Sequence, residues 1–347
     1  DVPETSKYHH CIVANLNKIP LFLDYKNFLE ARGVSTLLFP YELITSFMGD
    51  SPQEQLRDAL NSLYMKNGIE SALIVGNNSS IPLMNLAIFG IDSRHEEVVP
   101  SDMFYADLSS DWDGNQNGFY GEIEGDFVDF TNEIDVGRLP FVNDSQITSY
   151  LQRLMSFFDE DKDNRRKILT AGGWITMKEE FLETKDNALF DIDGGQIVYT
   201  NYRNYFMGFE HQGLYEHEGM KPSKVVNQGS ALSDKNLIST LNNFEPLLIL
   251  LAGHGNRTNI TQKVWVNDNN NNKIIDFLEM KERSIIDLYS FDKVNKKHQS
   301  VVFADACSSI NLEIDFNLGS EFLKKHAVGY VGSTANSYFF YGHDINP

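Results

Sequence analysis

Short continuous apolar runs alternate along this chain with segments in which apolar residues recur at helical spacing. Near the N-terminus, Cys11–Ala14, Thr36–Phe39 and Ala72–Val75 predict buried strands. The segments Leu21–Ala31 and Gln53–Lys66 between them predict helices. Strands that alternate with helices are typical of a parallel sheet built from β-α-β units, so we expect an α/β fold.

The same alternation continues through the rest of the chain. Ile134–Pro140 predicts a strand ended by proline, and a helix is expected from about Ser145 to Phe158. The charged stretch Asp159–Arg166 is the expected boundary between two α/β subdomains, residues 1–160 and 161–347. Beyond it we predict five strands and two helices: strands at Ile168–Ala171, Gln196–Tyr199, Leu247–Leu251, Val301–Ala304 and Ala327–Val331, and helices near Lys235–Asn243 and Gly319–Lys325.

Two of these apolar runs lead directly into reactive side chains. Leu247–Asn256 has the sequence LLILLAGHGN and carries His254, and Ser300–Ser309 has the sequence SVVFADACSS and carries Cys307. Because the carboxyl ends of parallel strands meet at one edge of a sheet, we expect both side chains at that edge. A cysteine attacks a carbonyl carbon as the thiolate, and a nearby imidazole can take up its proton.

The residues around these two side chains are small. Gly253 and Gly255 let the backbone turn sharply beside a substrate, and the Gly255 N–H group is placed to bind a developing oxyanion. The alternative interpretation is that Cys307 is an ordinary buried thiol and that His254 caps a strand. The two motifs together favour a Cys-His dyad over that alternative.

Composition narrows the classes of protein that fit. With 347 residues, of which 41% are hydrophobic, the chain can bury two cores. A formal net charge of −20 argues against nucleic acid as a partner. No apolar stretch approaches the roughly 18 residues of a membrane helix. Cys11 and Cys307 are the only cysteines, too few for a disulfide scaffold. We therefore expect a soluble globular protein.

Two loops rich in Asp and Asn have the spacing of calcium ligands. In residues 113–124, oxygen-bearing side chains take positions one, three and five, glycine takes position six, and an acid closes position twelve. Residues 268–279 repeat this pattern with Lys273 in place of the glycine. The predicted ligands are Asp113, Asn115, Asn117, Phe119, Glu122 and Glu124 in the first loop, and Asp268, Asn270, Asn272, Ile274, Asp276 and Glu279 in the second. A polar surface loop is the alternative for each.

The motifs LAGHGN and ADACSS are similar to the His-Gly and Ala-Cys signatures of the gingipain family of cysteine peptidases, within the larger caspase-like clan. Tyr105–Leu108, Asp135–Pro140 and Gly329–Thr334 extend the resemblance over most of the chain. The long separation between His254 and Cys307 indicates a divergent member. The resemblance implies a caspase-like fold of mostly parallel sheets flanked by helices, a secreted or cell-surface endopeptidase, and bound calcium. It also implies an immunoglobulin-like domain that often follows and that this sequence lacks.

The resemblance also assigns roles to residues. It makes Cys307 the nucleophile, His254 the general acid and base, and the N–H groups of Gly255 and Cys307 the oxyanion hole. Family members can carry an acid that orients the histidine, just after the strand that matches Ile168–Ala171. This chain has Gly172–Gly173 there, so the third member of the site stays open.

Several residues are candidates for that third member or for the substrate pocket. The acids Glu179, Glu180, Glu183 and Asp186 could orient the histidine or receive a basic side chain, although the sequence favours a solvated charged surface for any one of them. The candidate pocket residues are Glu183, Ser333 and Tyr338. Tyr338 begins an aromatic run that is also compatible with core packing.

Three functions compete at this point. The first, which we favour, is a secreted, calcium-stabilised cysteine endopeptidase that cleaves a protein or peptide through a thioester. The second is a sortase-like transpeptidase, which would form the same thioester, so that only an assay with an amine acceptor separates the two. The third is a calcium-dependent binding module without catalysis, and the intact His254 and Cys307 argue against it.

Overall fold

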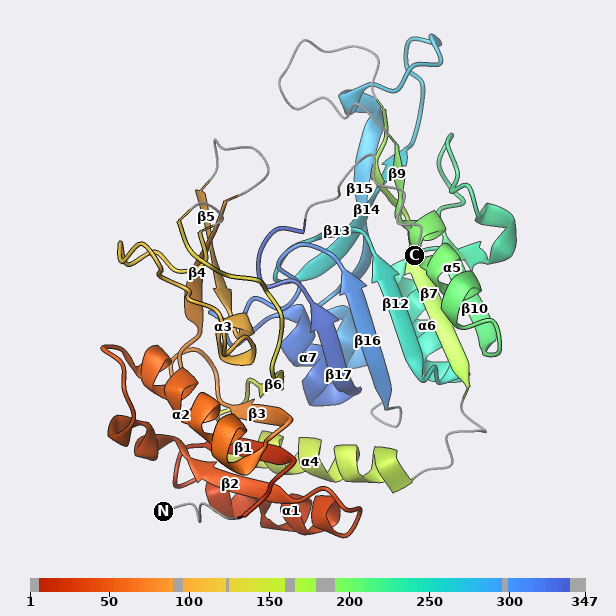
Figure 1. Cartoon of the computed structure of the whole chain (residues 1–347). Helices are drawn as coiled ribbons and strands as arrows, with labels where there is room; N and C mark the ends of the chain where they lie inside the picture. The colour runs from red at the N-terminus through yellow and green to blue at the C-terminus, as the bar shows by residue number, and fades with distance from the viewer. Residues whose placement is uncertain are drawn as a thin grey trace. The chain divides into compact units, whose positions relative to one another are not determined.

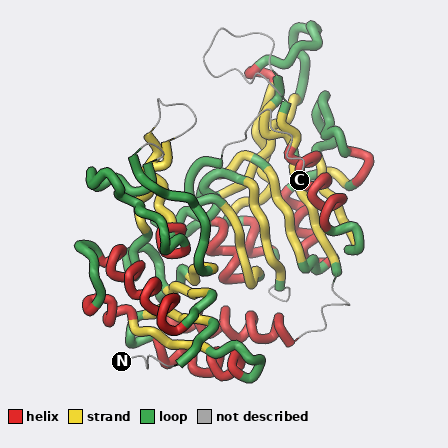
Figure 2. The backbone as a smooth tube through the Cα atoms, viewed as in Figure 1, coloured by secondary structure: helices red, strands yellow, loops and turns green. Residues whose placement is uncertain are grey.

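The computed structural model of the chain describes residues 6–89, 96–122, 125–159, 166–178, 191–294 and 299–337. The chain divides into two compact units, Asp1–Met155 with Leu312–Asp315, and Ser156–Asn311 with Phe316–Pro347. Both units are α/β, with mostly parallel sheets flanked by helices, which confirms the predicted fold class (Figures 1 and 2). None of the helices within the described ranges is both long and apolar enough to cross a membrane.

A four-stranded parallel sheet lies at the centre of the first unit, in the order β2-β1-β3-β6. Its strands are β1 (His10–Ala14), β2 (Thr36–Pro40), β3 (Ser71–Val75) and β6 (Asp135–Leu139). Right-handed crossovers place α1 (Leu23–Glu30) and α2 (Pro52–Asn67) on opposite faces of this sheet (Figure 1). The remaining elements of this part are the hairpin β4 (Met84–Phe89) and β5 (Glu96–Ser101), the short helix α3 (Met103–Ala106), and α4 (Asp144–Asp159).

Helix α2 begins and ends at residues whose chemistry fits those positions. The Ser51 side chain accepts a hydrogen bond from the Glu54 N–H group, and the Glu54 carboxylate accepts one from the Ser51 N–H group. This capping box satisfies two backbone donors that have no partner inside the helix. Gly68 ends the helix at a φ of 72°, a left-handed conformation that glycine adopts without strain.

The second unit contains a six-stranded parallel sheet in the order β11-β10-β7-β12-β16-β17. Its strands are β7 (Lys167–Gly172), β10 (Glu210–Tyr215), β11 (Ser230–Ala231), β12 (Leu248–Ala252), β16 (Ser300–Asp305) and β17 (Ala327–Gly332). The helices are α5 (Gly194–Tyr205), α6 (Asp234–Phe244) and α7 (Leu318–Lys325). Four of the five residues of β12 are buried, as expected for a central strand covered on both faces.

A smaller antiparallel sheet lies at the carboxyl end of this parallel sheet. Its strands are β8 (Trp174–Thr176), β9 (Ile192–Asp193), β13 (His254–Gly255), β14 (Asn259–Trp265) and β15 (Met280–Asp287). The central strands β7 and β12 run almost directly into β8 and β13, so the small sheet continues the large one (Figure 1). The position of His254 is therefore set by both sheets.

The predicted strand at Gln196–Tyr199 is wrong, because these residues lie inside helix α5. The Asp193 carboxylate caps the helix by accepting hydrogen bonds from the N–H groups of Gly195 and Gln196. From Val198 onward the apolar residues that pack on the sheet recur at helical spacing, with Tyr202 and Phe206 following at intervals of four. Over four residues, an apolar run does not distinguish the helical period from a buried strand.

Cys11 lies in the core of the first unit and is fully buried. Burial raises the pKa of its thiol to about 12, because the thiolate would lose its hydration. Cys11 is therefore a packing residue, whereas Cys307 is only half-buried.

A buried ion pair fastens β6 to neighbouring backbone in the first unit. The Arg138 guanidinium donates to both carboxylate oxygens of Asp102, at 2.7 and 2.6 Å. It also donates to the carbonyl oxygens of Gly76 and Ile81. The Arg138 side chain is only 3% exposed, so its charge depends on Asp102 for compensation.

We expect Asp102→Ala to lower the free energy of unfolding by about 3 kcal/mol or more, because it leaves the buried guanidinium without a counter-charge. Urea denaturation measures this loss. The control is Glu30→Ala, which breaks the more exposed Lys26–Glu30 pair on α1 and should change the stability by no more than about 0.5 kcal/mol. Equal losses in the two variants would contradict this account of Arg138.

Candidate active site

The register of β12 and β16 brings the two predicted catalytic residues to one edge of the sheet. The strands pair in parallel with Ala252 opposite Asp305, so His254 and Cys307 each follow two residues beyond this last pair. The N–H group of Gly253 continues the pairing with a 3.2 Å hydrogen bond to the Asp305 carbonyl.

Gly255 lies directly against the backbone of Cys307. A Cβ atom added at Gly255 would lie 2.3 Å from the Cys307 carbonyl oxygen and 2.6 Å from its nitrogen, so only glycine fits. Along an antiparallel pair, the N–H groups of successive residues point alternately toward and away from the partner strand. The Asn256 N–H group donates to the carbonyl of Asn259 on β14. The Gly255 N–H group therefore points away from β14, to the side on which Gly253 bonds to β16.

The imidazole of His254 is oriented by a backbone carbonyl. Its Nε2 atom lies 2.5 Å from the carbonyl oxygen of Ile175 on β8. A carbonyl only accepts hydrogen bonds, so Nε2 carries the proton and Nδ1 is the basic nitrogen of the neutral ring. The resemblance points to an acidic side chain near Gly172–Gly173, where this chain has none. The sequence gives no sign of the contact from Ile175, because any residue type supplies a carbonyl.

The surroundings of His254 keep its imidazole neutral. Burial is the main cause that lowers its pKa below the ordinary value, and the positive charge of Lys263 lowers it further. The hydrogen bond to Ile175 and the negative charge of Glu282 act in the opposite direction. Lys263 on β14 and Glu282 on β15 lie opposite each other in the antiparallel register. A neutral ring at pH 7 is ready to accept a proton.

The sulfur of Cys307 lies close to the backbone of one residue after β17, Ser337. It accepts a hydrogen bond from the Ser337 N–H group over 3.3 Å, and it lies 3.7 Å from the Ser337 carbonyl oxygen. The candidate pocket residue Ser333 lies in the same segment, where its carbonyl accepts a hydrogen bond from the Ile310 N–H group. Ser333 is therefore close to the loop that carries Cys307.

The other candidate residues of the substrate pocket lie outside the described residues. These are Glu183 and Tyr338, together with the acids Glu179, Glu180 and Asp186. Of the predicted pocket, the described structure therefore places only Ser333.

The two Asp- and Asn-rich loops fold in the same way. In each, the aspartate at position one accepts hydrogen bonds from the N–H groups at positions five and six, and the asparagine at position three also accepts from position five. The asparagine at position five accepts from position seven, which is Phe119 or Ile274. Position six is left-handed in both, with φ of 82° at Gly118 and 60° at Lys273. The lysine thus takes the conformation that the pattern assigns to glycine.

The loops differ in their later positions. Glu122 accepts hydrogen bonds from the side-chain amides of Asn115 and Asn117, and Glu124 lies outside the described residues. In the second loop, the Glu279 carboxylate is buried and accepts hydrogen bonds from the Asn269 N–H group and the Trp265 indole. Asp276 instead caps a turn at the Leu278 N–H group, at 2.9 Å.

The predicted ligands of each loop combine carboxylates with asparagine side-chain amides. Across the described parts of the chain, no three or more His, Cys, Asp or Glu side chains gather closely enough to hold a metal ion. Amide and backbone carbonyls are nevertheless ligands that calcium accepts, so the loops fit calcium better than metals that prefer imidazole or thiolate.

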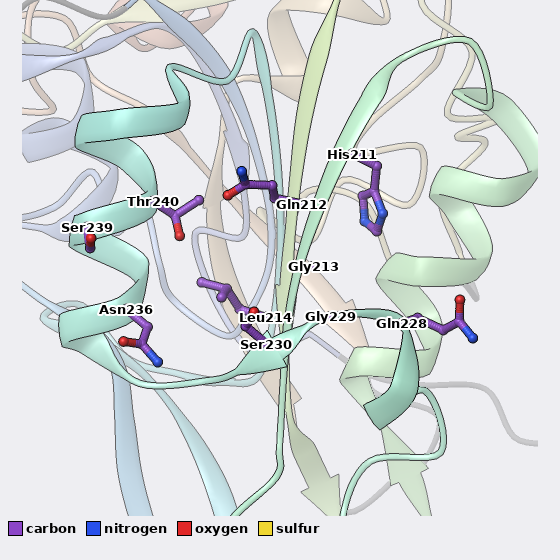
Figure 3. A pocket seen from close by; sticks show the side chains of 10 residues that line it. All are labelled: His211, Gln212, Gly213, Leu214, Gln228, Gly229, Ser230, Asn236, Ser239 and Thr240. Atoms are coloured by element: carbon purple, nitrogen blue, oxygen red, sulfur yellow. The ribbon is translucent and has the colours of Figure 1, made fainter.

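A separate cavity of about 550 Å³ lies beside β10 in the second unit. Figure 3 shows Gln212 and the α6 side chains Asn236 and Thr240 on one side of β10, and His211 on the other. The His211 ring stacks on Tyr202 at 3.9 Å, and burial lowers the pKa of its imidazole to about 4. His211 is thus a neutral packing residue at pH 7, and the residues that line this cavity include neither His254 nor Cys307.

The chain matches one known protein family by sequence. The model described as Peptidase family C25 matches residues 8–347. A search of curated proteins finds no match.

Several solved structures resemble this chain, among them the following three. The Arg specific cysteine proteinase gingipain R is 15% identical, with a TM-score of 0.63, over 98% of this chain and 65% of that one. A complex of the pro- and mature domains of RgpB from Porphyromonas gingivalis is 14% identical, with a TM-score of 0.62, over 95% and 64%. A structure described as a protease is 13% identical, with a TM-score of 0.59, over 95% and 60%. These likenesses show a gingipain-like caspase fold, and the chain spans less than two thirds of each of the three.

We expect Gly255→Ala to lower the free energy of unfolding by about 1–3 kcal/mol, the usual range for a side chain forced into a filled space. The added methyl group would collide with the backbone of Cys307. The matched control is Gly208→Ala in the same unit, where an added Cβ meets nothing within 4 Å. Chemical denaturation compares the two variants, and an equally stable Gly255→Ala protein would show that the backbones can separate freely.

Proposed function

Because the chain belongs to peptidase family C25, the gingipain family of cysteine peptidases, we propose that it cleaves peptide bonds with Cys307 as nucleophile and His254 as general acid and base. The observation that carries this proposal is the register of β12 and β16, which places both residues at the same distance beyond one sheet edge. The contact of Gly255 with the Cys307 backbone supports it.

The reaction follows from the roles of these groups. Nδ1 of His254 takes the thiol proton, and the thiolate of Cys307 attacks the carbonyl carbon of the scissile bond. The N–H groups of Gly255 and Cys307 bind the oxyanion. When the intermediate collapses, the leaving amine takes the proton from His254 and a thioester remains. Water, activated by His254, then attacks the thioester, which releases the acid and restores the thiol.

The substrate in this proposal is a protein or peptide outside the cell. The net charge of −20 favours a basic residue at P1, and the structurally similar gingipain R is described as Arg specific. Glu183, Ser333 and Tyr338 remain the candidates for the pocket. Transfer to an added amine, in place of hydrolysis, would identify a transpeptidase that uses the same residues.

Calcium is the cation that we propose for the two loops. Asp113, Asn115 and Asn117 would hold it in the first loop, and Asp268, Asn270 and Asn272 would hold it in the second. The Glu279 carboxylate is already used by Trp265 and Asn269, so we expect weaker binding in the second loop than in the first. In both loops calcium would stiffen the fold and would take no part in the chemistry.

We expect Cys307→Ala to abolish peptidase activity and to leave the fold intact, because it removes only one sulfur from an edge of the sheet. We expect His254→Ala to lower the catalytic rate by at least about 100-fold, the usual scale for the loss of acid and base catalysis. Turnover of a peptide library and circular dichroism measure the two properties. A peptidyl electrophile should label the wild type and fail to label Cys307→Ala, since Cys11 is buried. Wild-type turnover in Cys307→Ala would exclude the mechanism.

We expect calcium to raise the melting temperature, because a ligand that binds the folded state stabilises it by mass action. Scanning calorimetry with excess chelator, and then with calcium restored, measures the effect in the wild type, Asp113→Ala and Asp268→Ala. Each variant should lose part of the shift, and Asp268→Ala should also lower the activity because its loop lies between His254 and Cys307 in the sequence. Identical melting curves with and without calcium would exclude calcium binding and show that both loops are ordinary polar turns.

A further inference from the structure

The sulfur of Cys307 faces both backbone groups of Ser337, at different distances. The N–H group lies at 3.3 Å and the carbonyl oxygen at 3.7 Å. A hydrogen-bond donor favours the charged form of the group that it contacts, whereas a carbonyl can only accept from the neutral thiol. The shorter contact is thus the one that stabilises the thiolate.

The Ser337 N–H group belongs to a segment that is fastened to the loop of the nucleophile. The N–H group of Ser308 donates to the Ala335 carbonyl over 2.7 Å, and the Ile310 N–H group donates to the Ser333 carbonyl over 3.1 Å. Ser308 has a φ of 50°, a left-handed conformation that a residue other than glycine adopts only at an energetic cost. A donor held in this way needs no rearrangement when charge forms on the sulfur.

The charged groups around Cys307 make such a donor useful. In the described parts of the chain, two titratable residues follow the same edge of the sheet: His254 on β13 and Asp305, two residues before Cys307, at the end of β16. Burial raises the pKa of Asp305, and an ionised Asp305 would disfavour a thiolate. His254 supports a thiolate fully only when protonated, and its surroundings favour the neutral ring. Lys263 and Glu282 act through His254, and the residues from Ser333 to Ser337 carry no charge.

We propose that the backbone N–H group of Ser337 is a further part of the catalytic machinery, a neutral donor that stabilises the thiolate of Cys307 once His254 has taken its proton. This inference rests on the proposed function, in which Cys307 is the nucleophile. The donor is a main-chain group, so the hydroxyl of Ser337 has no part in it. The chemistry requires an N–H group at position 337, and every residue except proline provides one.

The test compares Ser337→Pro, which removes the N–H group, with Ser337→Ala, which keeps it. The rate of alkylation of Cys307 by iodoacetamide, measured against pH, gives the apparent pKa of the thiol. We expect Ser337→Pro to raise that pKa by about one unit or more, the effect of one lost hydrogen bond to a charged group. Ser337→Ala should keep the wild-type pKa. Equal values in the two variants would overturn the proposal. Faster alkylation of Ser337→Pro at an unchanged pKa would also overturn it, because the contact would then only shield the sulfur.

A second measurement avoids the proline, which could displace the whole segment. In the ¹⁵N-labelled wild type, the Ser337 amide proton should move to lower field as pH rises, with the same midpoint as the alkylation profile. It should not titrate in Cys307→Ala. A Ser337 amide resonance whose chemical shift does not change when Cys307 ionises would exclude the hydrogen bond. Neither measurement uses peptide turnover, so a failure of this inference is distinguishable from a failure of the proposed peptidase activity.

Discussion

The parallel pairing of β12 with β16 is the constraint on which the candidate site depends. Ala252 lies opposite Asp305, and a shift of one residue in either strand would separate His254 from Cys307 and turn one of them to the other face. The apolar side chains of both strands set this register, because β12 is buried on both faces and β16 buries Val302 and Ala304 on one face. Packing in the core thereby sets the positions of His254 and Cys307 beyond the carboxyl ends of β12 and β16.

Backbone groups supply much of what surrounds the dyad. Ile175 offers its carbonyl to His254, Ser337 offers its N–H group to Cys307, and Gly255 lies against the Cys307 backbone. Backbone groups of regular elements have little freedom to move, so they orient a reacting group at a low cost in entropy. The paired central strands β7 and β12 run on as β8 and β13, so the carbonyl of Ile175 and the imidazole of His254 lie in two strands that both pair with β14.

The sequence predicts those parts of the fold and the site that side chains determine. The apolar runs predict β1, β2, β3, β7, β12, β16 and β17, and the motifs at two strand ends single out His254 and Cys307 as candidates. The segment Gln196–Tyr199 was misassigned because its helical period becomes visible only over the longer span that follows the cap at Asp193. Strand β10 has the largely polar sequence EHQGLY and gives no apolar run. The contacts from Ile175 and Ser337 come from the main chain, so no residue type in the sequence marks them.

The complete burial of Cys11 leaves this protein with a single accessible thiol, because its sequence contains only one other cysteine. A thiol reagent in slight excess would therefore titrate Cys307 alone and count intact sites one per chain. An oxidant would reach the same sulfur, and no intrachain disulfide could protect it unless the first unit opened. Reversal of such oxidation would need a thiol from outside the molecule.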